Sequence, residues 1–164
     1  LMPALATEIL GIPEGDRRYG WLFSAIGVGA LFGAYLVGKC AATKVRGKLM
    51  VSGAVFFALA LIGISRTTSV WLAIALFFIV GLAAIAQLAT ANTLTQSLAP
   101  DHLRGRAVSA HMFAMAGLQP IGSYIAGFSA KHWGVANSLA IGGLVFLVYT
   151  LGVLVLRPRV ASLE

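Results

Sequence analysis

Long runs without a single charged residue are the feature that most constrains how this chain folds. A helix that crosses a bilayer needs about 20 consecutive, mostly apolar residues, and five segments of the sequence meet that requirement. These segments are residues 20–38, 49–65, 70–97, 107–130 and 133–156. Backbone groups inside lipid must hydrogen-bond within their own segment, which favours helices. The sequence therefore predicts an all-α fold, a polytopic transmembrane helical bundle.

Composition supports this class and excludes several others. Of the 164 residues, 59% are hydrophobic and 10% are charged, whereas soluble domains carry about 25% charged residues. The net charge of +7 comes from residues that lie between the apolar runs, so they form no patch for nucleic acid. Cys40 is the lone cysteine, which excludes an internal disulfide framework. We expect no cofactor, no metal site and no nucleic-acid partner.

Residues 1–11 are apolar but too short to span a bilayer, and Gly11, Pro13 and Gly15 are loop signals at their end. We interpret them as the last turns of a sixth helix that begins outside this sequence.

Lysine and arginine counts predict the orientation in the membrane. Alternate connections carry eight basic residues on one side and four on the other, with four in residues 39–48 alone. The richer side is expected to be cytoplasmic. This predicts a multi-pass protein of the inner (plasma) membrane with its C-terminus in the cytoplasm. Trp21, Trp71 and Trp133 then fall near the outer ends of their segments, where interfacial anchors belong.

Two motifs resemble a known transporter family. Residues 98–109 read LAPDHLRGRAVS, and residues 117–127 read GLQPIGSYIAG. Together with the opening Leu-Met-Pro-Ala-Leu-Ala at residues 1–6, they resemble the C-terminal half of the major facilitator superfamily. More narrowly, they are similar to the branch of bacterial exporters that includes the enterobactin exporter and macrolide-efflux proteins.

This resemblance implies an organisation and an activity. Residues 1–11 would be the end of helix 7, the five segments would be helices 8–12, and the N-terminal half would be absent. The implied function is secondary active export of a small, partly apolar molecule, such as a drug or siderophore, by alternating access. The implied partners are the lipid bilayer, the missing N-terminal six-helix half, a small-molecule substrate and, for an antiporter, protons. The alternative is a non-transporting membrane scaffold or partner subunit.

Candidate gating residues lie in two cytoplasmic loops. The resemblance places residues 39–48 at the second copy of the family's basic loop motif, with candidates Lys44, Arg46 and Lys48. No acid lies between Gly38 and Lys48, so the charge relay of that motif is incomplete here. The second loop contributes Asp101, Arg104, Gly105 and Arg106. These residues either latch one gate state or serve topology and headgroup contact, and Gly105 is expected to permit a tight turn.

Uncharged polar residues are the candidates for the substrate cavity. They are Gln87, Gln119, Tyr124, Tyr35 and Ser24. Each one either faces a water-filled cavity or makes a hydrogen bond between helices. Pro120 removes a helical hydrogen bond, so Gly117, Pro120 and Gly122 are candidates for a functional bend or a tolerated packing kink.

The five segments contain no aspartate, glutamate, lysine or arginine. An enzyme is not expected, because paired acids or an activated nucleophile are missing at membrane depth. His111 is the titratable candidate within a segment, as an interfacial packing residue or a proton relay. Small residues repeat every four positions at Ala25, Gly29 and Gly33, and again at Ser123 and Gly127, which favours close helix packing.

Overall fold

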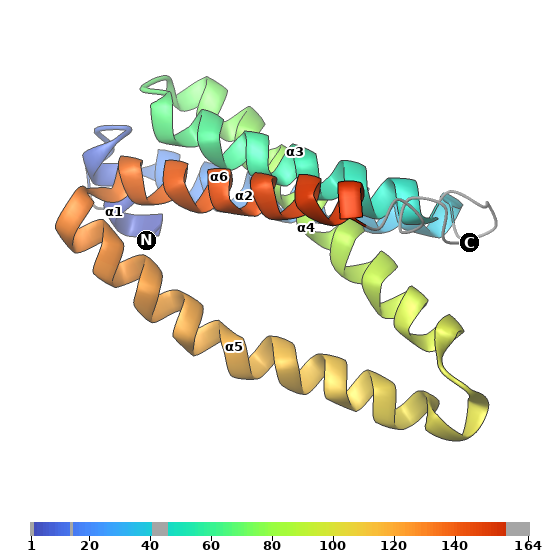
Figure 1. Ribbon diagram of the computed structural model, residues 1–164. Coiled ribbons are helices and arrows are strands. Elements are labelled where there is room, and N and C mark those ends of the chain that lie inside the picture. Colours follow the sequence, from blue (N-terminus) through green and yellow to red (C-terminus); the bar gives the residue numbers. More distant parts are fainter. Residues whose placement is uncertain (1, 14, 41–45, 157–164) are drawn as a thin grey trace.

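The computed structural model describes residues 2–13, 15–40 and 46–156, and every regular element in them is helical. Figure 1 shows the arrangement. The elements are α1 (Met2–Glu8), α2 (Arg17–Cys40), α3 (Arg46–Arg66), α4 (Val70–Leu98), a short 3-10 turn η1 (Asp101–Leu103), α5 (Arg104–Trp133) and α6 (Val135–Leu156). The predicted all-helical fold is confirmed.

Four of the described helices are long and apolar enough to cross a membrane. They are α2, α3, α4 and α6. Helix α5 is long enough, with 30 residues, but the amide, hydroxyl and proline groups around Gln119 and Tyr124 make it less apolar than the others. The fifth expected span, at residues 107–130, is therefore not among the helices that are apolar enough to cross a membrane.

Backbone-to-backbone packing joins α2 to α4, and this is the most extensive helix contact. A Cβ atom added at Gly29 would press on the Phe78 carbonyl and lie 3.0 Å from the Leu82 nitrogen. From the other side, a Cβ at Gly81 would lie 2.8 Å from the carbonyl carbon of Ile26. The small-residue stripe of α2 thus packs closely, as its spacing predicts. The second stripe does not, because a Cβ at Gly127 would meet nothing within 4 Å.

An apolar core lies at the end of the bundle where α2, α4 and α6 begin. It includes Leu5, Ile12, Leu22, Ile64, Phe77 and Val135. The core fixes α1 against the larger helices. The loop that follows α1 has positive φ at Gly11 (59°) and Gly15 (85°), which agrees with the loop signals in the sequence.

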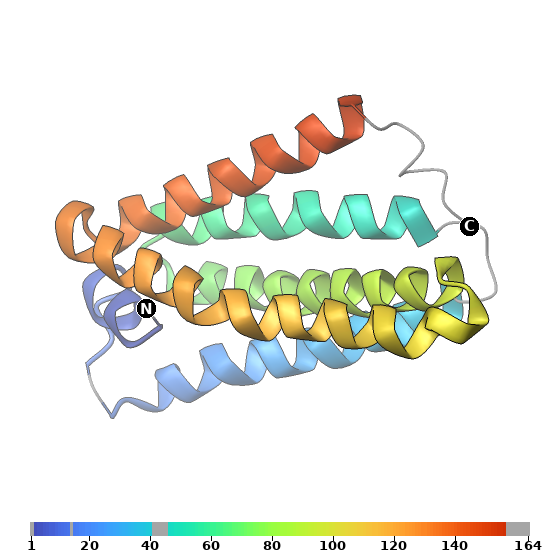
Figure 2. The same ribbon diagram turned by 60° about the horizontal axis from the view of Figure 1, so that its bottom comes forward.

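Helix α5 stands apart from the rest of the bundle (Figure 1), and none of its residues is buried. It contacts α4 and α6, its neighbours in the chain. Near α6, the hydroxyl oxygens of Ser129 and Ser138 lie 2.7 Å apart. The helix continues through Pro120 and follows a curved path (Figure 1). In the turned view of Figure 2, α5 passes in front of α4.

Candidate functional site

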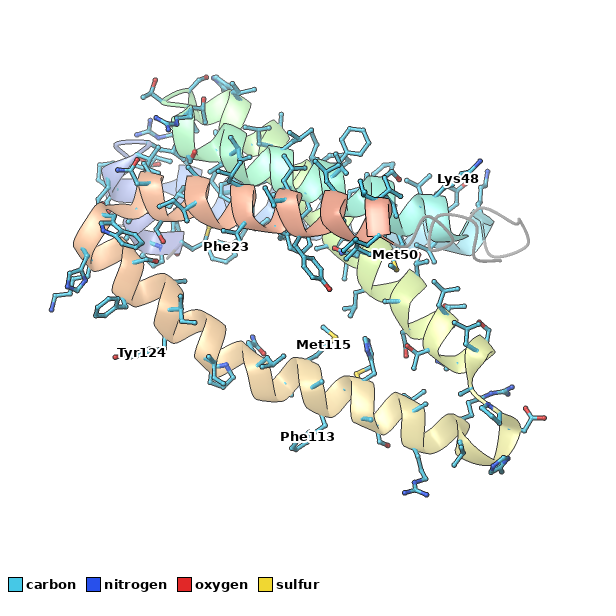
Figure 3. The ribbon with its side chains drawn as sticks, viewed as in Figure 1. Phe23, Lys48, Met50, Phe113, Met115 and Tyr124 are labelled. Atoms are coloured by element: carbon cyan, nitrogen blue, oxygen red, sulfur yellow. The ribbon has the colours of Figure 1, made fainter. Side chains whose placement is uncertain are left out.

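The space between α5 and the other helices is bordered by side chains from two sides. Phe23 of α2 and Met115 of α5 both point into this space in Figure 3. Phe113 and Tyr124 of α5 point away from it. The two faces of α5 therefore differ: one looks toward the bundle, and the other presents aromatic side chains outward.

The cavity candidates do not converge on one pocket in the described structure. Gln87 lies partly buried on the α3 side of α4, because a Cβ added at Gly53 of α3 would lie 3.9 Å from its own Cβ. Gln119 is exposed on α5. Tyr124 is 74% exposed, and its ring stacks along the helix on Phe128 with centroids 6.4 Å apart.

The remaining two cavity candidates lie on α2. Tyr35 is exposed, and the ammonium nitrogen of Lys39 lies 5.1 Å from its ring centroid, a cation–π contact at the end of the helix. Ser24 lines an apolar groove of about 690 Å³ between α2 and α4. The five cavity candidates therefore have different surroundings: Gln87 is partly buried between helices, Ser24 lines a groove, and the other three are exposed.

The groove that contains Ser24 is closed at one end by two stacked indole rings. Trp21 and Trp71 have centroids 5.9 Å apart and an interplanar angle of 28°. Trp21 lies near the start of α2 and Trp71 near the start of α4, so both rings lie at the same end of the bundle. We expected separate interfacial anchors. The sequence held one signal of this contact, since both tryptophans lie close to the start of their apolar segments.

In the first gating loop, Lys44 lies outside the described residues. Arg46 begins α3. Lys48 is exposed and points outward near the start of α3 (Figure 3). Of the three gating candidates in this loop, Lys48 is therefore the one whose side chain the structure shows to be exposed.

In the second gating loop, Arg104 connects the end of α4 to the turn that follows. One guanidinium nitrogen donates to a carboxylate oxygen of Asp101 at 2.7 Å, and Nε donates to the carbonyl of Gln96 at 3.1 Å. The second bond satisfies one of the carbonyls that a helix end leaves without a partner. The contact is a local clasp of the α4–α5 hairpin.

Gly105, the residue after Arg104, does not form the tight turn that the sequence predicts. Gly105 lies inside the first turn of α5 and has no positive φ, so the tight turn expected there is wrong. The chain instead turns at Ala99 and Pro100, which are extended. Arg106 is exposed on α5.

Two buried polar atoms lack a hydrogen-bond partner among the described residues. They are Oδ1 of Asn92 in α4 and Nε2 of His111 in α5. The two residues lie at similar distances from the turn that joins their helices, so they occupy similar levels of the hairpin. The sequence singled out His111, but it gave no reason to connect it with Asn92.

Charged and metal-ligating groups are sparse in the described part of the chain. In residues 2–13, 15–40 and 46–156 no group of three or more His, Cys, Asp or Glu side chains could hold a metal ion. Just before α2, the Asp16 carboxylate accepts hydrogen bonds from Arg18, including one from a guanidinium nitrogen at 2.6 Å, and these bonds lower the pKa of the Asp16 carboxyl.

Comparisons with known proteins give the family. The family described as "Transmembrane secretion effector" matches residues 1–164. A D-xylose transporter from Levilactobacillus brevis is 32% identical over 91 residues, which cover 56% of this chain and 20% of that transporter. No solved structure matches. The aligned part thus spans about a fifth of its relative. The chain belongs to the transmembrane secretion effector family of the major facilitator superfamily, whose members are membrane transporters and not enzymes.

Proposed function

We propose that this chain is the C-terminal helical bundle of a secondary active transporter that exports a small, partly apolar molecule by alternating access. The match of a secretion family to residues 1–164 is the observation that carries the proposal. In such transporters two bundles rock against each other around a central site. The proposed partner is therefore an N-terminal six-helix half. The proposed location is the inner membrane, with the C-terminus in the cytoplasm.

The character of α5 supports this proposal. Gln119, Ser123 and Tyr124 are exposed near the middle of the helix. Polar groups at membrane depth need a hydrogen-bond partner or water. A helix of this kind fits a position beside an aqueous cavity or another bundle. The curved path of α5, which contains Pro120, fits a helix that moves (Figure 1).

The chemistry of the spans favours a partly apolar substrate. The expected membrane segments contain no Asp, Glu, Lys or Arg, so this half offers amide, hydroxyl and aromatic groups. A drug or siderophore suits such surroundings. The D-xylose transporter that matches part of the chain suggests a more polar substrate. The transport assay described next also tests D-xylose as a substrate.

The test measures transport by the complete protein in a bacterial host that lacks its own drug-efflux pumps. Gln87→Leu and Gln119→Leu are compared with the wild type, and Gln96→Leu is the matched control near the end of α4. A lost hydrogen bond is worth about 1 kcal/mol, so we expect roughly a fivefold to tenfold fall in efflux for Gln119→Leu. The control keeps full efflux.

Other outcomes decide against parts of the proposal. Full efflux in both Gln variants would show that these residues do not contact the substrate. Movement of D-xylose without drug efflux would replace export of an apolar molecule by sugar transport. A correctly inserted protein that moves neither compound would favour the scaffold alternative.

A further inference from the structure

A groove with an apolar wall opens where α3 ends and α6 begins, away from the gating loops and the cavity candidates. Its volume is about 460 Å³. Its lining residues are Arg66, Trp133, Asn137, Ala140, Ile141 and Leu144. Helices α3 and α6 are both long and apolar enough to span the membrane. The groove therefore lies at one end of two helices that can span the bilayer, on a face that the described helices leave open.

The polarity of the groove changes with depth. Asn137, Ala140 or Ile141, and Leu144 follow one another at helical spacing, so they form a stripe along α6. With a rise of about 1.5 Å per residue, Leu144 lies roughly 10 Å deeper than Asn137. The rim is polar, and the wall below it is aliphatic. A molecule with a polar head and an apolar tail matches this order.

Two donors stand at the rim. Arg66 is the last residue of α3 and is exposed. A guanidinium group matches the geometry of phosphate and makes paired, charge-assisted hydrogen bonds with it. Trp133 is 59% exposed, and its indole N–H prefers the interface between headgroups and hydrocarbon. The side chain of Asn137 donates to the Trp133 carbonyl at 3.0 Å, which fixes this corner of the rim.

The charge around the rim favours an anion. Lys131 lies two residues before Trp133 in the chain and is exposed, but it is not among the residues that line the groove. None of the six lining residues is acidic. Two described acids lie at the same end of the bundle: Asp16 is paired with Arg18 at 2.6 Å, and Glu8 lies on α1 and does not line the groove. A lipid whose headgroup carries a net negative charge fits this rim better than a zwitterionic lipid, whose amine would meet the Arg66 guanidinium.

We propose that this groove binds one anionic phospholipid. The phosphate lies on Arg66 beside Trp133, and one acyl chain follows Ala140, Ile141 and Leu144. Free phosphate could use the rim but would gain nothing from the apolar wall. A partner helix is far larger than this volume. The site is independent of the transport proposal, because its binding is measured without any substrate.

The experiment uses the complete purified protein and native mass spectrometry. Phosphatidylglycerol and phosphatidylcholine with identical acyl chains are offered in turn. We expect preferential retention of phosphatidylglycerol by the wild type and about a tenfold loss in Arg66→Gln, since charge-assisted hydrogen bonds disappear. Ala140→Phe, which fills the wall and keeps the charge, loses the same lipid. Lys131→Gln removes a cation at the same end of the bundle, and this control variant should keep most of the bound phosphatidylglycerol.

Several results would overturn the proposal. They are equal retention of both lipids by the wild type, unchanged retention in Arg66→Gln, or an equal loss in Lys131→Gln. Displacement of the lipid by inorganic phosphate alone would assign the rim to free phosphate instead. If Ala140→Phe fails to insert, Leu144→Ser tests the wall, because Leu144 lines the groove and is exposed. Unchanged retention in that variant would likewise contradict the proposal.

Discussion

Replacement of Gly29 by alanine tests the packing between α2 and α4 most directly. The added Cβ would overlap the carbonyl oxygen of Phe78 and lie 2.9 Å from its carbonyl carbon. These are backbone atoms, which cannot rotate away as the end of a side chain can. The helices must separate by a substantial part of an ångström or tilt. Either movement also loosens the contact at Gly33, whose Cβ would lie 3.2 Å from the Leu82 Cα.

The expected cost follows from overpacking. Extra atoms forced into a well-packed interface cost about 1–3 kcal/mol. For a chain of this size each kcal/mol shifts the melting temperature by roughly 2–4 °C, so Gly29→Ala should lower it by roughly 2–12 °C. The double variant Gly29→Ala/Gly81→Ala should lose less stability than the sum of the losses in the two single variants. One separation of the helices relieves both overlaps, and neighbouring sites do not add independently.

Gly27→Ala is the control, because a Cβ at Gly27 would meet nothing within 4 Å. Both variants gain the same helix propensity, which is worth up to about 1 kcal/mol. The difference between them therefore isolates packing. Melting is followed by size-exclusion chromatography of the complete protein in detergent. Near-ultraviolet circular dichroism reports the Trp21–Trp71 stack, which spans the same two helices. Equal melting temperatures for both variants would refute the reasoning.

Three further changes have defined outcomes. Gly134→Ala should cost about 1–3 kcal/mol, because its φ of 80° and ψ of 156° suit glycine alone; Gly134→Asn should not recover the loss in melting temperature, and Gly142→Ala should cost nothing. Asp16→Asn should lower the melting temperature at about pH 7. The Arg18 contact lowers the pKa of Asp16, so its stabilisation is present above the ordinary value of about 3.9 and is lost as the pH falls through the lowered value. A difference that persists near pH 2 would contradict this cause. Asp101→Asn should change stability by less than about 1 kcal/mol, since its pair with Arg104 is exposed; a larger loss in a melting experiment would assign the clasp a greater role.

The positions of the helices were readable from the sequence because charged residues and Pro100 interrupt the apolar runs. Their rotation about their own axes was not. A helix such as α6 is apolar on every face, so no stripe indicates which side meets a neighbour. Likewise, the sequence did not show that Gln87 of α4 lies on the side that faces α3, and its place in a substrate cavity stays a prediction. The α2 seam could be predicted because glycine spacing, unlike hydropathy, marks one face.

Both the sequence and the structure indicate that polar side chains of α5 need hydrogen-bond partners outside the described bundle. Helix α5 is the least apolar of the long helices, and it buries none of its residues. If lipid covered its middle, the side chains of Gln119 and Ser123 would each need a partner that hydrocarbon cannot supply. A neighbouring bundle or an aqueous cavity supplies such partners. Ser123→Leu should therefore ease insertion of α5 while it lowers transport by the complete protein. A variant that improves both, measured by membrane yield and efflux, would place lipid against this face.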